Sequence, residues 1–173
     1  MINKVYIEYL LIKGDKKAFA EILSIIQPKL LSFATNILKD KSIAQDAVQD
    51  SLINIIRGVA KLKDHKKFHA WIYQVTRNKC LDIIRKNNKY KKDCDLDAIV
   101  EPQSKATNHD EQSDMMRMIK QLPPKQKNII QLFYYDGFTV REIAEILTTP
   151  AGTIKALLFE ARGHLKQLFG EKL

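Results

Sequence analysis

The sequence has little cysteine, little glycine and no long apolar segment, and each absence excludes a class of protein. Cys80 and Cys94 are its two cysteines, and neither lies in a Cys-x-x-Cys or Cys/His cluster, so a structural zinc site is not expected. The six glycines stand singly, which excludes a glycine-rich phosphate loop. No apolar run reaches the roughly 18 residues that span a bilayer. Two unclustered thiols fit a reducing cytoplasm, with Cys80 expected to be buried.

Patterns typical of catalysis are also missing. The four histidines show no metal-ligand spacing such as His-Glu-x-x-His, and no Gly-x-Ser-x-Gly nucleophile elbow occurs. No other combination of acid, base and nucleophile stands out along the chain. We therefore expect a protein that is not an enzyme and that uses neither a metal nor another cofactor.

Charge, by contrast, is abundant and unevenly distributed. The chain has 29 Lys and Arg against 20 Asp and Glu, a net charge of +9 that suggests a polyanionic partner. The net charge is +11 over residues 1–92, −5 over residues 93–111 and +3 over residues 112–173. The acidic stretch lacks helical periodicity, which favours a linker between two domains.

Apolar residues recur at helical spacing on both sides of the acidic stretch, and neither β-alternation nor an internal repeat is apparent. An all-α fold with two small helical domains joined by a flexible linker is therefore expected. The expected divisions are a first domain over residues 1–90, a linker over 91–112 and a second domain over 113–173.

Start and stop signals divide the first domain into helices. Asp15 is expected to open the first helix, which Pro28 breaks or restarts. Ser42 is expected to cap the next helix, which ends near Gly58. After a basic loop, a further helix is expected over about Phe68–Lys86.

The last third of the chain has the pattern of a helix-turn-helix. Thr139 and Glu142 have the spacing of a capping box, and Thr149 followed by Pro150 predicts the start of a second helix. The apolar stripe of that helix, at spacings of 4, 3, 4 and 3, is formed by Ile154, Leu158, Ala161, Leu165 and Leu168. In such motifs the second helix usually enters the DNA major groove.

Aromatic and basic residues are interleaved around the start of the Phe68–Lys86 segment. Phe68, Trp71 and Tyr73 stand among Lys66, Lys67, Arg77 and Lys79. This arrangement suits opened nucleic acid, because bases stack on rings while cations hold phosphates. A lone tryptophan in a small helical domain is usually a core residue, and Asp82 with Arg85 fits a local i,i+3 pair. From the residues alone, the two interpretations carry equal weight.

Polar side chains gather on one side of the preceding helix, opposite its apolar stripe. They are Gln45, Asp46, Gln49, Asp50 and Asn54. Such a face is usually only solvated. Within a basic domain it is also what a protein-docking surface would look like.

Taken in order, these motifs resemble the extracytoplasmic-function (group IV) sigma factors of bacterial RNA polymerase. Residues 14–19 are similar to the family's opening motif, and residues 38–50 to its helix that binds the polymerase clamp. Residues 68–86 resemble the segment that melts and reads the −10 promoter element. Residues 122–127 resemble the start of conserved region 4, and residues 139–162 its reader of the −35 element. The similarity covers nearly the whole chain.

The resemblance implies that the chain binds core RNA polymerase, through its clamp and flap, and promoter DNA. It assigns clamp binding to Asp46, Gln49, Asp50 and Asn54. It assigns −10 DNA binding to Lys61, Lys63, Lys66, Lys67, Phe68, Trp71, Arg77, Asn78, Arg85 and Lys86. It assigns −35 DNA binding to Arg141, Thr153, Lys155, Ala156, Phe159 and Arg162. It also implies an anti-sigma protein, often membrane-anchored, as a further partner.

The second helix departs from the family pattern. Ala156-Leu157 stands where Ser-Arg is usual, and Glu160 stands where an arginine is usual. Each lost phosphate contact should weaken DNA binding and flatten its salt dependence. Thr148 replaces a frequent turn glycine, although a β-branched residue disfavours positive φ. Two other readings therefore remain: a stand-alone helix-turn-helix regulator, and a sigma-like protein that acts mainly through protein contacts.

Overall fold

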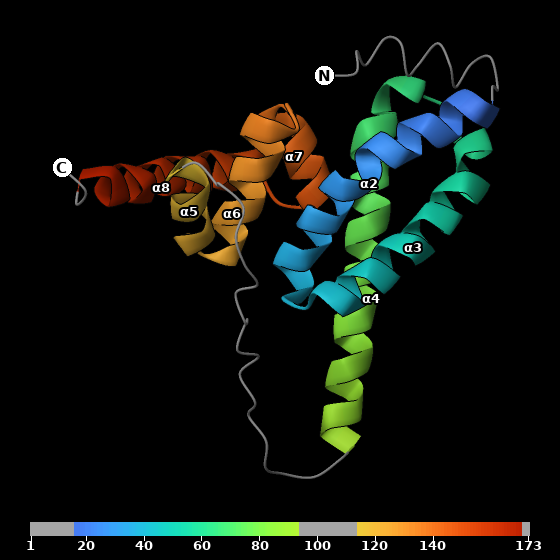
Figure 1. Cartoon of the computed structure of the whole chain (residues 1–173), viewed down its shortest axis with the longest axis horizontal. Coiled ribbons are helices and arrows are strands. Elements are labelled where there is room, and N and C mark those ends of the chain that lie inside the picture. The colour runs from blue at the N-terminus through green and yellow to red at the C-terminus, as the bar shows by residue number, and fades with distance from the viewer. Residues whose placement is uncertain (1–15, 94–113, 171–173) are drawn as a thin grey trace. The chain divides into compact units, whose positions relative to one another are not determined.

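The protein consists of two compact helical units (Figure 1). This computed structural model describes residues 16–93 and 114–170, and the units divide the chain at residues 1–102 and 103–173. Every regular element within the two described ranges is a helix, which confirms the all-α fold with two helical domains. Most of the predicted linker lies outside the described residues, as does Asp15, the expected start of the first helix.

The first unit is built from three helices that pack against one another: α2 (Lys16–Leu38), α3 (Lys41–Gly58) and α4 (Phe68–Asp93). Figure 1 shows α2 and α3 crossing α4. The rings of Phe33 and Tyr73 meet edge to face, with centroids 5.2 Å apart, and join α2 to α4 in the core. The apolar core also includes Ile22, Ile26, Leu30, Ala44, Ala47, Val48, Ile55, Phe68 and Ile72.

Pro28 lies inside α2, so the prediction that it breaks or restarts the helix is wrong. Proline removes one helical hydrogen bond and crowds the preceding turn. The apolar stripe nevertheless continues across it, since Ile26 before Pro28 and Leu30 after it are both buried. Burial against α3 and α4 on both sides of the proline favours one continuous helix.

The predicted cap of α3 is also wrong by two residues. The carboxylate of Asp40 accepts a hydrogen bond from the Ile43 backbone N–H at 2.9 Å, so Asp40 is the N-cap and Ser42 lies within the helix. Asp is as good an N-cap as Ser. The helix ends at Gly58, as expected. Beyond the next loop, α4 extends past the expected end at Lys86, because its polar continuation is rich in lysine, a good helix former.

Two buried hydroxyl groups in the first unit, those of Ser51 and Thr76, are satisfied by the helices that carry them. The Ser51 hydroxyl donates to the Ala47 carbonyl at 2.6 Å, and the Thr76 hydroxyl to the Ile72 carbonyl at 2.9 Å. Cys80 is fully buried, as predicted, and burial raises the pKa of its thiol to about 11. Because the thiolate is the reactive form, this cysteine is a packing residue rather than a nucleophile.

The second unit packs three short helices and one π-helical turn around a long helix. They are α5 (Asp114–Gln121), α6 (Pro124–Ile130), η3 (Gln131–Tyr135, the π-helical turn), α7 (Val140–Leu147) and α8 (Ala151–Gly170). Helices α5, α6 and α7 all contact α8. The core comprises Met118, Leu122, Ile129, Ile130, Leu132, Phe138, Ile143, Ile146, Ile154, Leu158 and Ala161. At the edge of this core, His164 Nδ1 lies 2.8 Å from Gln126 Oε1.

Helices α7 and α8 form the predicted helix-turn-helix. The capping box of α7 is present: Glu142 N–H donates to the Thr139 hydroxyl at 3.3 Å, and Thr139 N–H donates to the Glu142 carboxylate at 2.7 Å. The start of α8 differs from the prediction, because the Pro150 carbonyl accepts the first helical hydrogen bond, from Ile154 N–H. The Thr149 hydroxyl instead donates to the Leu147 carbonyl at 3.1 Å, which closes the turn.

Thr148, at the end of α7, has left-handed backbone angles, with φ 50° and ψ 50°. The left-handed conformation costs a residue with a Cβ about 1–2 kcal/mol. Thr148→Gly should therefore raise the free energy of unfolding of this unit by about 1 kcal/mol, after the entropy that glycine loses on folding is subtracted. Urea unfolding followed by circular dichroism measures the change. Thr149→Gly, at a residue without positive φ, is the control and should not raise the free energy of unfolding. If the two substitutions change the free energy of unfolding equally, the backbone of Thr148 is not strained.

Candidate nucleic-acid and protein interfaces

The basic loop of the first unit is ordered by two short 3-10 helices, η1 (Val59–Lys61) and η2 (His65–Lys67). Asp64 caps η2, because its carboxylate accepts a hydrogen bond from the Lys66 backbone N–H at 3.1 Å. The four lysines of this loop that are assigned to −10 DNA are all exposed: Lys61, Lys63, Lys66 and Lys67. The loop therefore presents a group of cations on a defined backbone, directly before α4.

Two of the three aromatic rings that follow this loop are core residues. Phe68 is fully buried and packs near Phe19, at a centroid distance of 6.1 Å. Tyr73 is buried against Phe33. The prediction of Phe68 as a DNA-stacking residue is therefore wrong for the folded unit, because neither face of its ring is open to a base. The sequence could not separate the two readings, since an aromatic beside lysines is compatible with both.

Trp71, the third ring, is half-buried and leans on the end of α3. A Cβ added to Gly58 would lie 2.9 Å from Trp71 Cζ2 and 3.1 Å from Cη2, closer than ordinary contact. Gly58 therefore leaves room for the indole to lie close to the helix end. Its partial exposure beside the basic loop leaves Trp71 as the aromatic in this region that can reach a base.

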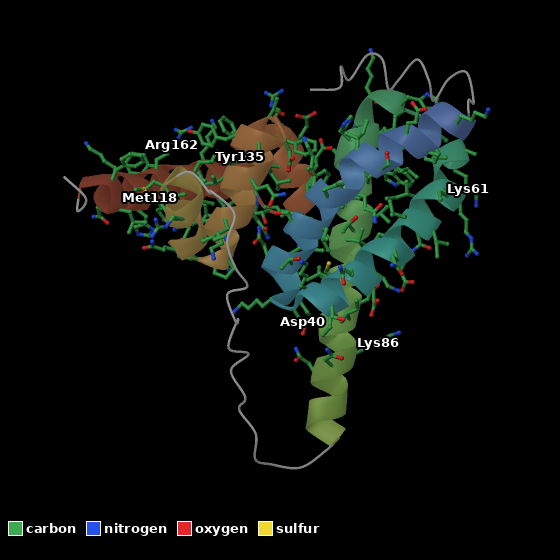
Figure 2. All side chains as sticks on the ribbon, viewed as in Figure 1. Asp40, Lys61, Lys86, Met118, Tyr135 and Arg162 are labelled. Carbon is green, nitrogen blue, oxygen red and sulfur yellow. The ribbon has the colours of Figure 1, made fainter. Side chains whose placement is uncertain are left out.

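Farther along α4, the residues assigned to −10 DNA are exposed or half-exposed. Asn78, Arg85 and Lys86 are exposed, and Figure 2 marks Lys86 on α4. Arg77 is half-buried; burial, and after it the positive charge of Arg85, lowers the pKa of its guanidinium, which still stays protonated at neutral pH. Arg85 makes the expected local ion pair with Asp82 at 3.1 Å. Both groups are largely solvated, so the pair adds little stability.

The polar face of α3 is exposed, and it contains apolar residues that sequence reasoning missed. Asp46, Gln49 and Asn54 are exposed. The Asp50 carboxylate is half-exposed and lies 2.6 Å from Lys79 Nζ on α4, so it also ties the two helices together. The exposed large apolar residues of α3 are Ile43, Ile53 and Ile56. At 100° per residue, Ile53 falls between Asp46 and Gln49, in the middle of the polar face.

In the second unit, α8 turns the assigned −35 residues away from the core. Its buried residues are Ile154, Leu158 and Ala161. The exposed residues are Thr153, Lys155, Ala156, Phe159 and Arg162, and Arg141 on α7 is exposed as well. Phe159 is 78% exposed, an unusual position for a ring with no further role. Glu160 is also exposed, whereas Leu157 is half-buried and packs partly inward.

Arg162 is held by two aromatic residues that no sequence motif connects with it. Its Nε–H donates to the Tyr134 hydroxyl at 2.8 Å. Its Cζ lies 5.7 Å from the centre of the Tyr134 ring and 5.8 Å from that of Phe133, within cation–π distance. Tyr134 comes from η3, 28 residues earlier in the chain. No local pattern could have revealed this pairing.

Other kinds of site find little support in the described parts of the chain. Within residues 16–93 and 114–170, no group of three or more His, Cys, Asp or Glu is placed to hold a metal ion. The same residues contain no helix that is long and apolar enough to cross a membrane. What they do present is two sets of exposed cations and aromatics, one on each unit, and a polar and apolar face on α3.

Comparison with known families identifies the class of protein. The model of sigma-70 region 2 matches residues 24–90, and the model of sigma-70 region 4 matches residues 112–165. The chain therefore belongs to the sigma-70 family of RNA polymerase sigma factors. Within that family it is an extracytoplasmic-function (ECF) sigma factor.

The curated relatives agree with this placement. The chain is 28% identical over 172 residues to the ECF RNA polymerase sigma factor SigW of Bacillus subtilis, with 90% of each chain covered. It is 25% identical over 164 residues to the ECF RNA polymerase sigma-E factor of Escherichia coli K12, covering 87% of this chain and 85% of the relative. Both relatives are matched along nearly their whole length.

A solved structure of similar fold is that of the sigma factor RpoE from Bartonella quintana, in complex with the anti-sigma factor NepR. It has a TM-score of 0.65 and 24% identity, and the match covers 89% of this chain and 98% of that one. CnrH, in complex with the cytosolic domain of CnrY, is similar with a TM-score of 0.59 and 16% identity. At these identities the similarity supports the fold.

Proposed function

We propose that this protein binds core RNA polymerase, directs it to promoters through −10 and −35 elements, and helps to open the DNA there. The observation that supports the proposal is the presence of two separate surfaces with exposed cations and accessible aromatic rings in a chain that matches both sigma regions. One is the lysine loop with Trp71 on the first unit, and the other is the outer face of α8 on the second. A stand-alone helix-turn-helix regulator would need only the second.

Each of the two surfaces is assigned to one promoter element. The lysines of the 61–67 loop hold the phosphates of the −10 region, and Trp71, on the same helix as Arg77 and Asn78, meets a base that leaves the stack. Flipping a base costs a few kcal/mol, which stacking and hydrogen bonds in the loop must offset. The −35 element is contacted by exposed residues in the N-terminal half of α8, namely Thr153, Lys155 and Phe159.

The third surface, the outer face of α3, suits protein rather than DNA. It carries two carboxylates, three amides and three exposed isoleucines, a mixture in which the carboxylates repel phosphates and which a protein partner can cover. We assign it to the polymerase clamp. An anti-sigma protein is a further proposed partner, because both structural neighbours are complexes with a second protein. A non-catalytic role in the cytoplasm, where the polymerase works, completes the proposal.

Run-off transcription tests the proposal directly. Purified bacterial core polymerase is mixed with the full chain and fragmented genomic DNA, and the RNA start sites are mapped. Starts that appear only with the chain, and share two spaced elements upstream, are the expected result. The variant with Lys63, Lys66 and Lys67 changed to Gln should bind polymerase but open promoters poorly. Core enzyme that initiates no better with the chain than without it would overturn the proposal.

A gel shift without polymerase separates the proposal from the stand-alone regulator. An isolated sigma factor should bind its promoter poorly, whereas a regulator binds duplex DNA tightly, usually as a dimer on a palindrome. Promoter fragments found by the run-off assay serve as probes. Tight binding by the chain alone would favour the regulator.

A further inference from the structure

The π-helical turn η3 brings an exposed tyrosine to the outer side of α8. In this turn the Asp136 backbone N–H bonds to the Gln131 carbonyl, five residues back, at 3.0 Å, and Gly137 follows with φ 71°. Buried Leu132 and Phe138 fix the turn on both sides. Single π-helical turns within helices occur frequently at functional sites, and η3 continues directly from α6. The Tyr134 ring is 54% exposed, yet its hydroxyl is engaged by Arg162.

The contacts of Arg162 fix the orientation of its guanidinium. Tyr134 takes the Nε–H, one of the five donors of the group, and two aromatic rings lie beside the cationic carbon. The pair of Nη atoms forms the opposite, forked end of the group. A fork of this kind matches two oxygens of one phosphate. A side chain so held has lost much of its rotamer freedom before any ligand arrives.

The position of Arg162 along α8 favours contact of its guanidinium with a DNA phosphate rather than with a base. Recognition helices read base edges with their N-terminal residues. Arg162 follows Ala151, the first residue of α8, by eleven residues, so it lies about 16 Å farther along the axis at 1.5 Å per residue. The major groove is about 12 Å wide. A side chain that far from the reading end reaches the groove wall, where the phosphates are.

We propose that Tyr134 is a positioning residue that holds Arg162 for contact with a backbone phosphate of the −35 DNA. This inference rests on the proposed function, since it takes the DNA from there. Arg162→Gln should weaken −35-dependent promoter binding about tenfold for every promoter sequence, because a charge-assisted phosphate bond is lost. It should also reduce the slope of log K against log salt by about 0.9. Tyr134→Phe should weaken binding about fivefold, the effect of one hydrogen bond.

The decisive measurement is a double-mutant cycle on the holoenzyme, with promoter DNA found by run-off mapping. In the Arg162→Gln background, Tyr134→Phe should have no further effect, because the side chain it positions is gone. Tyr135→Phe, which removes the neighbouring hydroxyl of the same turn, is the matched control and should act equally in both backgrounds. If Tyr134→Phe costs the same with and without Arg162, Tyr134 acts on its own and the inference is wrong.

An NMR measurement on the full chain tests the contact without polymerase or DNA. The Arg162 Nε–H resonance of ¹⁵N-arginine-labelled protein should be protected from solvent exchange, and Tyr134→Phe should remove that protection. Protection unchanged in Tyr134→Phe overturns the inference even if the chain is a sigma factor. Normal protection in a chain that never yields promoter-selective starts overturns the proposed function instead, and the phosphate role with it.

Discussion

Replacing Phe68 by alanine should lower the free energy of unfolding of the first unit by about 3–5 kcal/mol. The ring is fully buried at the junction of the basic loop and α4, near Phe19 and Trp71. Its removal leaves a cavity that the ends of three helices cannot easily fill. A loss of this size is a large part of the roughly 5–15 kcal/mol that stabilises a typical domain.

Trp71 provides the measurement, because it is the single tryptophan of the chain and lies in the same unit. Urea unfolding followed by its fluorescence reports on the first unit alone. Phe68→Leu, which keeps most of the apolar volume, is the matched control and should cost less than about 1.5 kcal/mol. A Phe68→Ala protein of normal stability that fails to open promoters would restore the DNA-stacking role that the burial of the ring excludes.

Changing Ile53 to aspartate should weaken binding to core polymerase about 30-fold or more, the effect of losing one interface hot spot. Ile53 is 46% exposed at the centre of the α3 face, one helical turn from Gln49 and Asp50. An apolar residue surrounded by polar ones is the usual arrangement at the middle of a protein interface. The new carboxylate would be desolvated on binding and would add to the acidic groups already there.

The matched control is Ile25→Asp. Ile25 is 52% exposed on α2, so this variant introduces the same chemical change outside the proposed surface. Both variants should keep the stability of the first unit within about 0.5 kcal/mol, because neither side chain is buried. Anisotropy of a labelled chain titrated with core polymerase gives the affinities. Equal losses at Ile53 and Ile25, or no loss at Ile53, would remove α3 from the polymerase interface.

Features that depend on neighbours in the sequence could be predicted well. The Thr139 and Glu142 capping box is correct because its two hydrogen bonds join residues three apart. The Asp82–Arg85 pair and the end of α3 at Gly58 are correct for the same reason. Even here the start of α3 was misplaced, because Asp40 and Ser42 are both good caps and only packing decides between them.

Features that depend on packing between helices could not be predicted. Helix α2 continues through Pro28 because the apolar residues before and after the proline are buried against α3 and α4. No local sequence pattern predicts this burial. The exposed Ile53 interrupts a polar face, although isoleucine is ordinarily a core residue. The sequence alone left the aromatics at the start of α4 with two equal readings, and the structure gives a different answer for each ring.

The sequence by itself determined the helical periods, the charge of each part and the order of motifs that places the chain among the ECF sigma factors. These properties depend on residues a few positions apart in the chain, because helix periodicity and capping are local. The tertiary structure alone decided which side chains can reach a partner. It buried Phe68, left Trp71 half-open against Gly58, and brought Tyr134 to Arg162. Contacts between distant residues depend on how the helices pack, and packing is a property of the whole core.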